Sequence, residues 1–209
     1  MTAQPGGAAG LSELVARSGF DATGRAGEPA TSIEYRVDAE RTVQLLADVL
    51  AGLHATELDA GALQMAVDAG QVADEAAATA AVGPEPLRTA RSAAYAHVSD
   101  DRLVEILLQG APAAAARQDR RVLTHGSPTL AHLWCDRGSA VGLVDWGRAA
   151  VADPYRDLAV AARSVATDMA PILITVLFER YGERSPDPVR LDWYSLAAEL
   201  LVPSGAAPQ

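Results

Sequence analysis

The 209-residue chain contains no lysine, only one cysteine (Cys135), and few aromatic residues, which make up 5% of it. All 17 basic residues are therefore arginines, and chemistry that needs a lysine ammonium group is excluded within this chain. A single cysteine also excludes an internal disulfide. The longest apolar run, at 170–178, is too short to span a bilayer, and the first residues lack the pattern of a secretory signal. These absences predict a cytoplasmic protein with no membrane segment.

No stripe of basic residues is present either, and the formal net charge is −10. Nucleic-acid binding requires clustered cations that displace counterions, so nucleic acid is excluded as a partner. An acidic surface is compatible with a cationic small molecule as ligand. Hydrophobic residues make up 49% of the chain, which is enough for one sizeable core.

Apolar spacing and capping residues predict a mostly helical chain with one small β-patch in its middle. The predicted helices are 11–20, 39–57 capped by Asp38, 61–82, 99–110 ended by Gly110, 155–167, 170–181, and 187–201 with Asp187 as N-cap. The predicted strands are 121–124, 133–136 and 141–145, the last two joined by a hairpin turn at "RGSA". Residues 1–10 and 202–209, rich in Gly, Pro and Ala, are expected to be loose ends.

The segment "VLTHGSPTLAHLWCDRGSAVGLVDWGRAAVADPYRDLAVAARS" (122–164) carries the most informative motifs. It resembles the catalytic centre of the aminoglycoside phosphotransferase family, and most closely its 3′-phosphotransferase (kanamycin kinase) branch. That family shows a T-H-G-D-x-x-x-x-N loop, a short hairpin, an I-D-x-G-R segment and then G-V-A-D-x-Y-x-D-[IL]-A. Here "VDWGR" (144–148) and "AVADPYRDLA" (150–159) match these segments almost position for position.

The resemblance implies an α+β, mostly helical, protein-kinase-like fold of the aminoglycoside phosphotransferase type. It covers residues 27–201, which correspond to the family's C-lobe with its small β-hairpin patch. Only residues 1–26 precede the hinge-like "GEPA" (27–30), which predicts a short, partly disordered N-terminal segment in place of the family's nucleotide-binding lobe. Residues 202–209 are expected to form a disordered tail.

Three positions of the family's reactive centre can be compared residue by residue. The family's catalytic Asp aligns with Ser127, and the Asn that would hold a metal aligns with His132. Only the metal-binding Asp of the second segment is retained, as Asp145. A Ser hydroxyl stays protonated at neutral pH and cannot act as the base, and imidazole is a poor ligand for Mg²⁺. Ser127 is thus expected to be inactive, and His132 with Asp145 to form at most a degenerate, weak metal site.

The resemblance assigns structural roles to four other residues. His125 would brace the loop, and Gly126 would allow an unusual backbone turn. Asp157 would help to hold the loop by hydrogen bonding. Asp153 and Asp157 are four residues apart and can share a helix face, where they would also stabilise a helix N-terminus. His54 and His97 are interpreted as ordinary helix-surface or partly buried residues.

Two other kinds of site were weighed for the same residues. Ser127 with a histidine and Asp145 could suggest a hydrolase triad, but "HGSPT" is no nucleophile elbow, and Pro128 lacks an N–H that could serve an oxyanion. His132 and Cys135 are three apart, and on a strand such side chains face opposite sides, which argues against a metal pair.

The sequence thus supports three hypotheses. The first is a degenerate family member that is inactive as a kinase and serves as a pseudoenzyme or as a binding module for an unknown protein or a cationic small molecule. The second is an active ATP-dependent small-molecule kinase, using ATP and Mg²⁺, that a partner or a swapped lobe completes. The third, weaker hypothesis is a structural subunit of a larger assembly. No cofactor is certain on sequence grounds.

Overall fold

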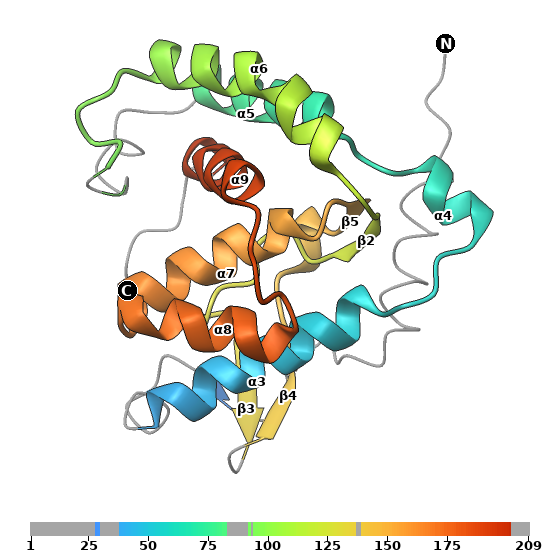
Figure 1. Cartoon of the computed structure of the whole chain (residues 1–209), viewed down its shortest axis with the longest axis vertical. Coiled ribbons are helices and arrows are strands. Elements are labelled where there is room, and N and C mark those ends of the chain that lie inside the picture. The colour runs from blue at the N-terminus through green and yellow to red at the C-terminus, as the bar shows by residue number, and fades with distance from the viewer. Residues whose placement is uncertain (1–27, 30–37, 83–91, 93, 137–138, 202–209) are drawn as a thin grey trace. The chain divides into compact units, whose positions relative to one another are not determined.

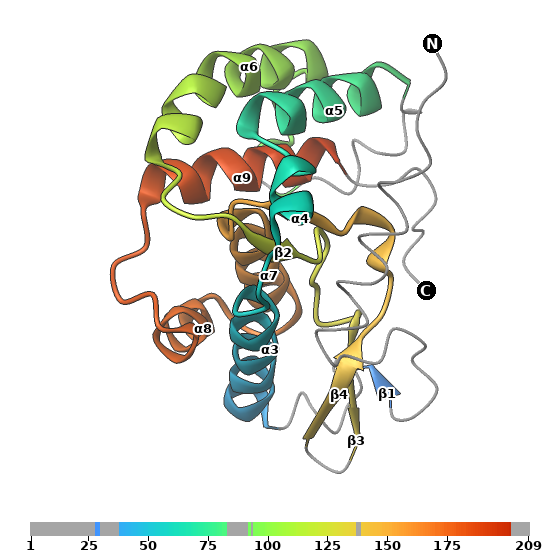
Figure 2. The same ribbon diagram turned by 90° about the vertical axis from the view of Figure 1, so that its right-hand side faces the viewer.

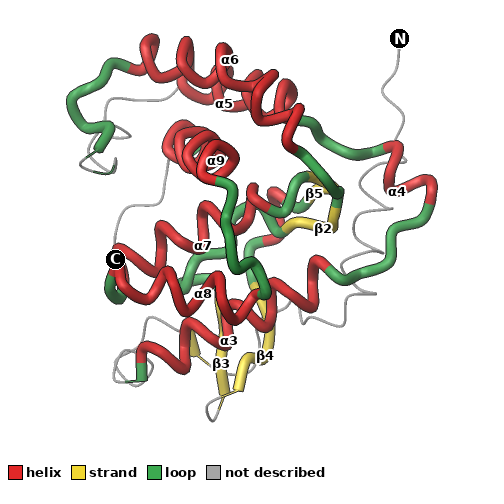
Figure 3. Tube along the Cα trace, viewed as in Figure 1, coloured by secondary structure: helices red, strands yellow, loops and turns green. Residues whose placement is uncertain are grey.

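The described part of the chain is mostly helical, and its strands form two small sheets (Figures 1 and 3). The computed structural model describes residues 28–29, 38–82, 92, 94–136 and 139–201. Predictions for both ends of the chain, including the helix at 11–20, lie outside these residues. The described residues belong to two compact units, one drawn from residues 1–66 and 119–186 and the other from 67–118 and 187–209.

The first unit contains both sheets and the helices around them. Its helices are α3 (Ala39–His54), α4 (Ala60–Gln64), η2 (Trp146–Arg148), α7 (Tyr155–Asp168), η3 (Pro171–Leu173) and α8 (Ile174–Tyr181). Its strands are β1 (Glu28–Pro29), β2 (Val122–Thr124), β3 (Leu133–Asp136), β4 (Ser139–Leu143) and β5 (Ala150–Ala152).

Helix α3 forms the core of this unit. Asp38 caps it by accepting a hydrogen bond from the Arg41 backbone N–H at 3.3 Å, as the sequence predicts. The apolar face predicted from the sequence is buried, and Leu46 and Leu50 are fully inaccessible. The helix packs against α8, β2 and β4, and Figure 2 shows it running beside the β3–β4 hairpin. It ends at His54, slightly before the predicted end, and so presents that side chain to the interior.

Two antiparallel sheets bring together the loops that follow β2 and β4. The predicted hairpin is present, but β4 begins at Ser139, inside the predicted turn, and ends at Leu143, before the predicted end. Strand β3 lies between β1 and β4. The second sheet pairs β2 with β5, and Thr124 lies opposite Ala150. Strand β5 was not predicted, because three residues are too few to show an alternating pattern; only its pairing with β2 defines it.

The second unit consists of α5 (Ala69–Val82), α6 (Asp100–Arg117) and α9 (Pro188–Leu200), which pack against one another. The predicted end of a helix at Gly110 is wrong, because α6 continues past it. A Cβ atom at Gly110 would lie 2.8 Å from Cδ1 of Trp193 in α9. The Trp193 indole N–H also donates to the Leu107 carbonyl at 2.9 Å. Gly110 thus allows two helices to approach closely and does not terminate α6.

The single helix predicted at 61–82 is also corrected, because two helices, α4 and α5, occupy this stretch. Each has its own aspartate at the start. Asp59 accepts from the Ala62 N–H at 2.8 Å, and Asp68 accepts from the Gln71 N–H at 2.9 Å. The Gln71 side chain in turn accepts from the Asp68 N–H, which completes a capping box. Asp68 therefore begins a second helix at a point where the alanine content alone predicted one uninterrupted helix.

Within the described part of the chain, no helix is long and apolar enough to cross a membrane. The helices predicted at 155–167 and 187–201 are confirmed as α7 and α9, whereas the one predicted at 170–181 is divided into η3 and α8. Helix α9 begins with Asp187, whose carboxylate accepts from the Val189 N–H at 2.9 Å, and with Pro188 in its first turn.

Candidate functional site

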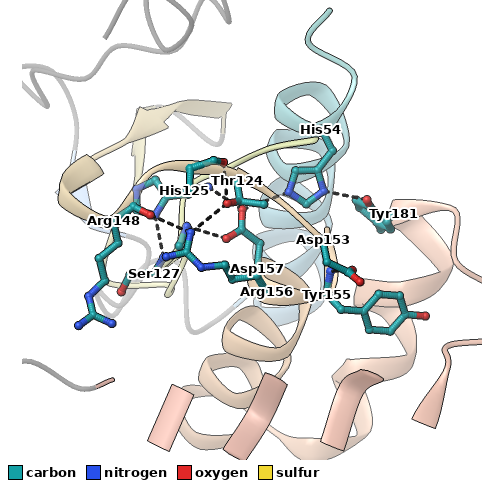
Figure 4. A network of polar contacts seen from close by, with 12 residues as sticks. His54, Thr124, His125, Ser127, Arg148, Asp153, Tyr155, Arg156, Asp157 and Tyr181 are labelled. Atoms are coloured by element: carbon teal, nitrogen blue, oxygen red, sulfur yellow. Dashed lines mark hydrogen bonds and ion pairs between the residues drawn. The ribbon is translucent and has the colours of Figure 1, made fainter. Parts of the chain in front are cut away.

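The loop after β2 is held by one buried carboxylate, that of Asp157 in the first turn of α7. Its Oδ1 accepts from the Gly126 N–H and its Oδ2 from the His125 N–H, both at 2.7 Å. Figure 4 shows the carboxylate pointing from α7 into the turn of this loop. Two short bonds to consecutive amides restrict the backbone directly before Ser127.

A series of side chains connects the buried Asp157 to the exposed Arg120, and Figure 4 shows its inner members His54 and Tyr181. His54 lies 3.1 Å from Asp157 through Nε2 and 2.8 Å from the Tyr181 hydroxyl through Nδ1. Arg120 donates to the same hydroxyl at 2.8 Å. Burial raises the pKa of Tyr181 to about 12, so the phenol keeps its proton. The hydroxyl oxygen accepts from Arg120, which can only donate, and the hydroxyl hydrogen is then directed to Nδ1 of His54. His54 therefore carries its own proton on Nε2 and donates it to Asp157.

Two opposing effects act on the pKa of Asp157. Complete burial acts to raise it, because a charged group loses its hydration. The hydrogen bond from His54 and the nearby N–H of His125 stabilise the carboxylate and outweigh burial. The pKa of Asp157 is held below its usual value, and the group is ionised at neutral pH.

A second loop, residues 145–148, is tied to the first through Arg156. Its guanidinium Nη1 donates to the Thr124 hydroxyl at 3.1 Å and to the Arg148 carbonyl at 2.8 Å. Gly126 has φ of 85°, and a Cβ atom there would lie only 2.3 Å from the Arg148 carbonyl oxygen. Glycine is required at this position both by the backbone conformation and by the approach of the second loop.

His125 links the same two loops from its buried position. Its Nε2 donates to the Val144 carbonyl at 2.9 Å, and its Nδ1 accepts from the Ser127 N–H at 3.3 Å. The ring contacts the Trp146 indole edge-on, with centroids 4.7 Å apart. Burial lowers the pKa of His125, which favours the neutral ring. The Val144 carbonyl can only accept, so the proton of the neutral ring lies on Nε2.

His132 and Asp145 meet at the open side of the two loops. Asp145 directly precedes η2 and has a left-handed backbone, with φ of 66° and ψ of 60°. Its carboxylate Oδ2 lies 3.6 Å from Nε2 of His132. The other ring nitrogen of His132, Nδ1, donates to the Ser127 carbonyl at 2.5 Å. The structure thus brings Ser127, His132 and Asp145 together.

Ser127 is half-buried, and both histidines contact its backbone. Among the described residues, neither imidazole forms a hydrogen bond with its hydroxyl. An activated serine needs a base on its oxygen, so this arrangement lacks the defining contact of a hydrolase triad. Asp153 lies apart from the loop: it is buried at the start of α7, and its Oδ1 accepts from the Tyr155 N–H at 2.8 Å.

Sequence reasoning missed His54, Tyr181 and Arg156 as parts of this site. A signal was available for His54, which lies four residues after Leu50 and so on the apolar face of α3. A histidine on a buried face needs polar partners. Nothing in the spacing of Tyr181 or Arg156 indicated what they contact.

We expect Tyr181→Phe to lower the free energy of unfolding by about 1–3 kcal/mol, because the buried Nδ1 of His54 loses its donor. Urea unfolding measures this change. Hydrogen exchange should also show faster exchange of the His125 and Gly126 amides, since the chain through Asp157 is loosened. Arg120→Ala is the control, because it removes the exposed end of this series of hydrogen-bonded side chains. It should change the free energy of unfolding and the amide exchange rates less than Tyr181→Phe does. Equal effects of the two variants would contradict this account of Tyr181.

Three comparisons relate this chain to known proteins. The model of the phosphotransferase enzyme family matches residues 19–194. An aminoglycoside 3′-phosphotransferase of Escherichia coli is 36% identical over 78 residues, which are 37% of this chain and 28% of that relative. An aminoglycoside phosphotransferase structure from Streptomyces rimosus has a TM-score of 0.69 at 22% identity, covering 84% of this chain and 67% of that one.

A crystal structure of an aminoglycoside-3′-phosphotransferase of type VIII is similar as well, with a TM-score of 0.66 and 26% identity. This similarity covers 84% of the present chain and 66% of that chain. The matched segment thus spans under a third of the E. coli relative and about two thirds of each solved structure. The protein-kinase-like architecture predicted from the sequence is confirmed by these structures.

Proposed function

Because the chain belongs to the phosphotransferase enzyme family, we propose that it is a degenerate member, inactive as a kinase, that serves as a binding module. The membership itself confirms the resemblance predicted from residues 122–164. The ligand of the proposed module would be a protein or a cationic small molecule, the latter in keeping with the net charge of −10.

The observation that carries this proposal is the serine at position 127, where the family motif has its catalytic aspartate. The backbone around it is held as an active loop would need, with two amides on Asp157. The reactive group at its end is a neutral hydroxyl. Loss of a general base typically costs ~10²–10⁴-fold in rate. A binding module derived from an enzyme would keep the hydrogen bonds that hold this loop and would lose the catalytic base.

Two further features support the same proposal. His132 stands where the motif has a metal-binding asparagine, and imidazole does not suit Mg²⁺. Phosphoryl transfer also depends on cations that neutralise the phosphates, and a lysine fills this role in kinases. The chain has no lysine, so an arginine or a second chain would have to replace it.

The second candidate function is an active ATP-dependent kinase for an aminoglycoside-like substrate, completed by a partner or a swapped lobe. Asp145 favours it, because the metal-binding carboxylate of the motif is retained and 62% of its side chain is exposed. In that case Asp145 would hold Mg²⁺, and the metal would neutralise charge on the ATP phosphates.

Phosphate transfer from labelled ATP to a panel of aminoglycosides tests the two functions, with the E. coli 3′-phosphotransferase as positive control. We expect no turnover by the chain, and none after Ser127→Asp or after Ser127→Asp with His132→Asn, because these variants still contain no lysine to neutralise charge on the ATP phosphates. Turnover by the unmodified chain that Asp145→Ala abolishes would establish the second function. Turnover gained by Ser127→Asp alone would show that only the base was lost.

A further inference from the structure

The pair formed by His132 and Asp145 has an unusual arrangement of lone pairs. A carbonyl oxygen only accepts hydrogen bonds, so Nδ1 of His132 carries the hydrogen that it donates to Ser127. In the neutral ring, Nε2 is then a bare lone pair. It faces a carboxylate oxygen of Asp145 at 3.6 Å, which is longer than a hydrogen bond. A cation bound between the two acceptors would satisfy both of them.

The distance between these two atoms fits a shared metal ion. Zinc lies about 2.0–2.2 Å from histidine nitrogen and carboxylate oxygen, so a separation of 3.6 Å corresponds to an N–Zn–O angle of roughly 120°. That angle is close to tetrahedral. Metal-binding histidines also commonly donate their second ring N–H to a backbone carbonyl, which fixes the tautomer and the ring orientation. Ser127 provides that carbonyl here.

The backbone holds both side chains in place. The Val144 N–H donates to the His132 carbonyl at 3.0 Å, so the segments that carry the two side chains are directly paired. Among the described residues, Asp145 alone combines a positive φ with a side chain. This conformation costs roughly 1–2 kcal/mol relative to the common regions, and such strain concentrates at functional sites. The Trp146 indole N–H, bound to the Leu143 carbonyl at 2.7 Å, supports it.

We propose that His132 and Asp145 bind a divalent transition metal of the zinc type, with water as the remaining ligands, in preference to magnesium. Magnesium favours oxygen ligands in octahedral geometry, whereas imidazole favours zinc and its neighbours. The histidine therefore does not fit the Mg²⁺ that the family motif implies. Side-chain exposures of 24% for His132 and 62% for Asp145 leave room for water. The described residues contain no group of three or more metal-binding side chains, so the site has two protein ligands and is weak.

Calorimetric titration of the intact chain with ZnCl₂, and separately with MgCl₂, tests this proposal without nucleotide. We expect zinc to bind more tightly than magnesium, and both His132→Asn and Asp145→Asn to weaken zinc binding about tenfold or more, as loss of a ligand or its support does. His97→Asn removes an exposed histidine outside the site and should leave the affinity unchanged. In labelled wild-type protein, zinc should shift the ¹⁵N resonance of His132 Nε2, a readout that needs no variant.

Three results would overturn the proposal: no zinc binding, magnesium binding as tight as zinc binding, or zinc binding that survives both substitutions at the site. An undisturbed Nε2 resonance at saturating zinc would also overturn it. The inference concerns the same loop pair as the proposed function and rests on it only in taking His132 as a departure from the motif. Because the assay measures metal binding and not phosphate transfer, either proposal can fail alone.

Discussion

Asp157→Ala is expected to lower the free energy of unfolding by at least about 3 kcal/mol, because three buried hydrogen bonds to a charged carboxylate are lost. The carboxylate is fully buried and accepts from the His125 and Gly126 amides and from His54. Alanine leaves these three donors buried without an acceptor, and each unsatisfied group costs about 1–3 kcal/mol. Urea unfolding at neutral pH measures the loss.

Two further variants make this prediction specific. Asp157→Asn keeps the shape and one accepting oxygen, so we expect a smaller loss than with alanine. Asp48→Asn is the matched control, because Asp48 also forms charged hydrogen bonds, to Arg180 at 2.6 and 2.8 Å, but lies at the surface. Exposed pairs contribute about 0–1 kcal/mol. A loss at Asp157 no larger than at Asp48 would contradict the role assigned to the buried carboxylate.

The same carboxylate gives a pH dependence with a defined sign. The pKa of Asp157 is lowered in the folded state, whereas the pKa of an aspartate in the unfolded state is about 3.9. The unfolded state therefore binds the proton first as the pH falls. The contribution of Asp157 is fully present above about pH 4 and is lost as the pH falls through the lower folded-state value. Between these limits, the stability of the wild type should decrease more steeply than that of Asp157→Asn, as acid titrations of both would show.

Gly126→Ala is expected to have the second-largest effect, a loss of at least about 2 kcal/mol. The left-handed backbone, with φ of 85°, costs a side-chain-bearing residue roughly 1–2 kcal/mol. The added Cβ would also meet the Arg148 carbonyl oxygen at 2.3 Å, so one of the two loops must move. Hydrogen exchange should report this movement as faster exchange at the Ala149 amide, which bonds to the Trp146 carbonyl in the second loop.

Gly182 provides a control that separates the two causes. It ends α8 with φ of 98°, but a Cβ atom there would have no neighbour within 4 Å. Gly182→Ala should therefore show the cost of the backbone conformation alone, about 1–2 kcal/mol, and no change in the second loop. If Gly126→Ala were no more destabilising than Gly182→Ala, the close approach of the two loops would have no energetic consequence.

Local patterns account for most of the helices and for the approximate positions of β2, β3 and β4. The spacing of Val43, Leu46 and Leu50 predicted the buried face of α3, and Asp187 followed by Pro188 predicted the start of α9. Such signals work because capping bonds and helical faces involve residues only a few positions apart. The order of motifs at 122–164 also predicted the family and its fold, since both loops retain their flanking residues.

Features that depend on distant residues were missed for one physical reason: no local pattern encodes which buried groups will meet. Strand β5 exists through its pairing with β2, and α6 passes Gly110 because Trp193 packs there. The bond between His54 and Asp157 joins residues 103 positions apart. Packing around α3 places His54 beside Asp157. This contact determines which ring nitrogen of His54 carries the proton, and it supports the carboxylate that binds the loop before Ser127. Residue types and motif order thus came from the sequence, whereas the polar network that supports the site arose from the tertiary fold.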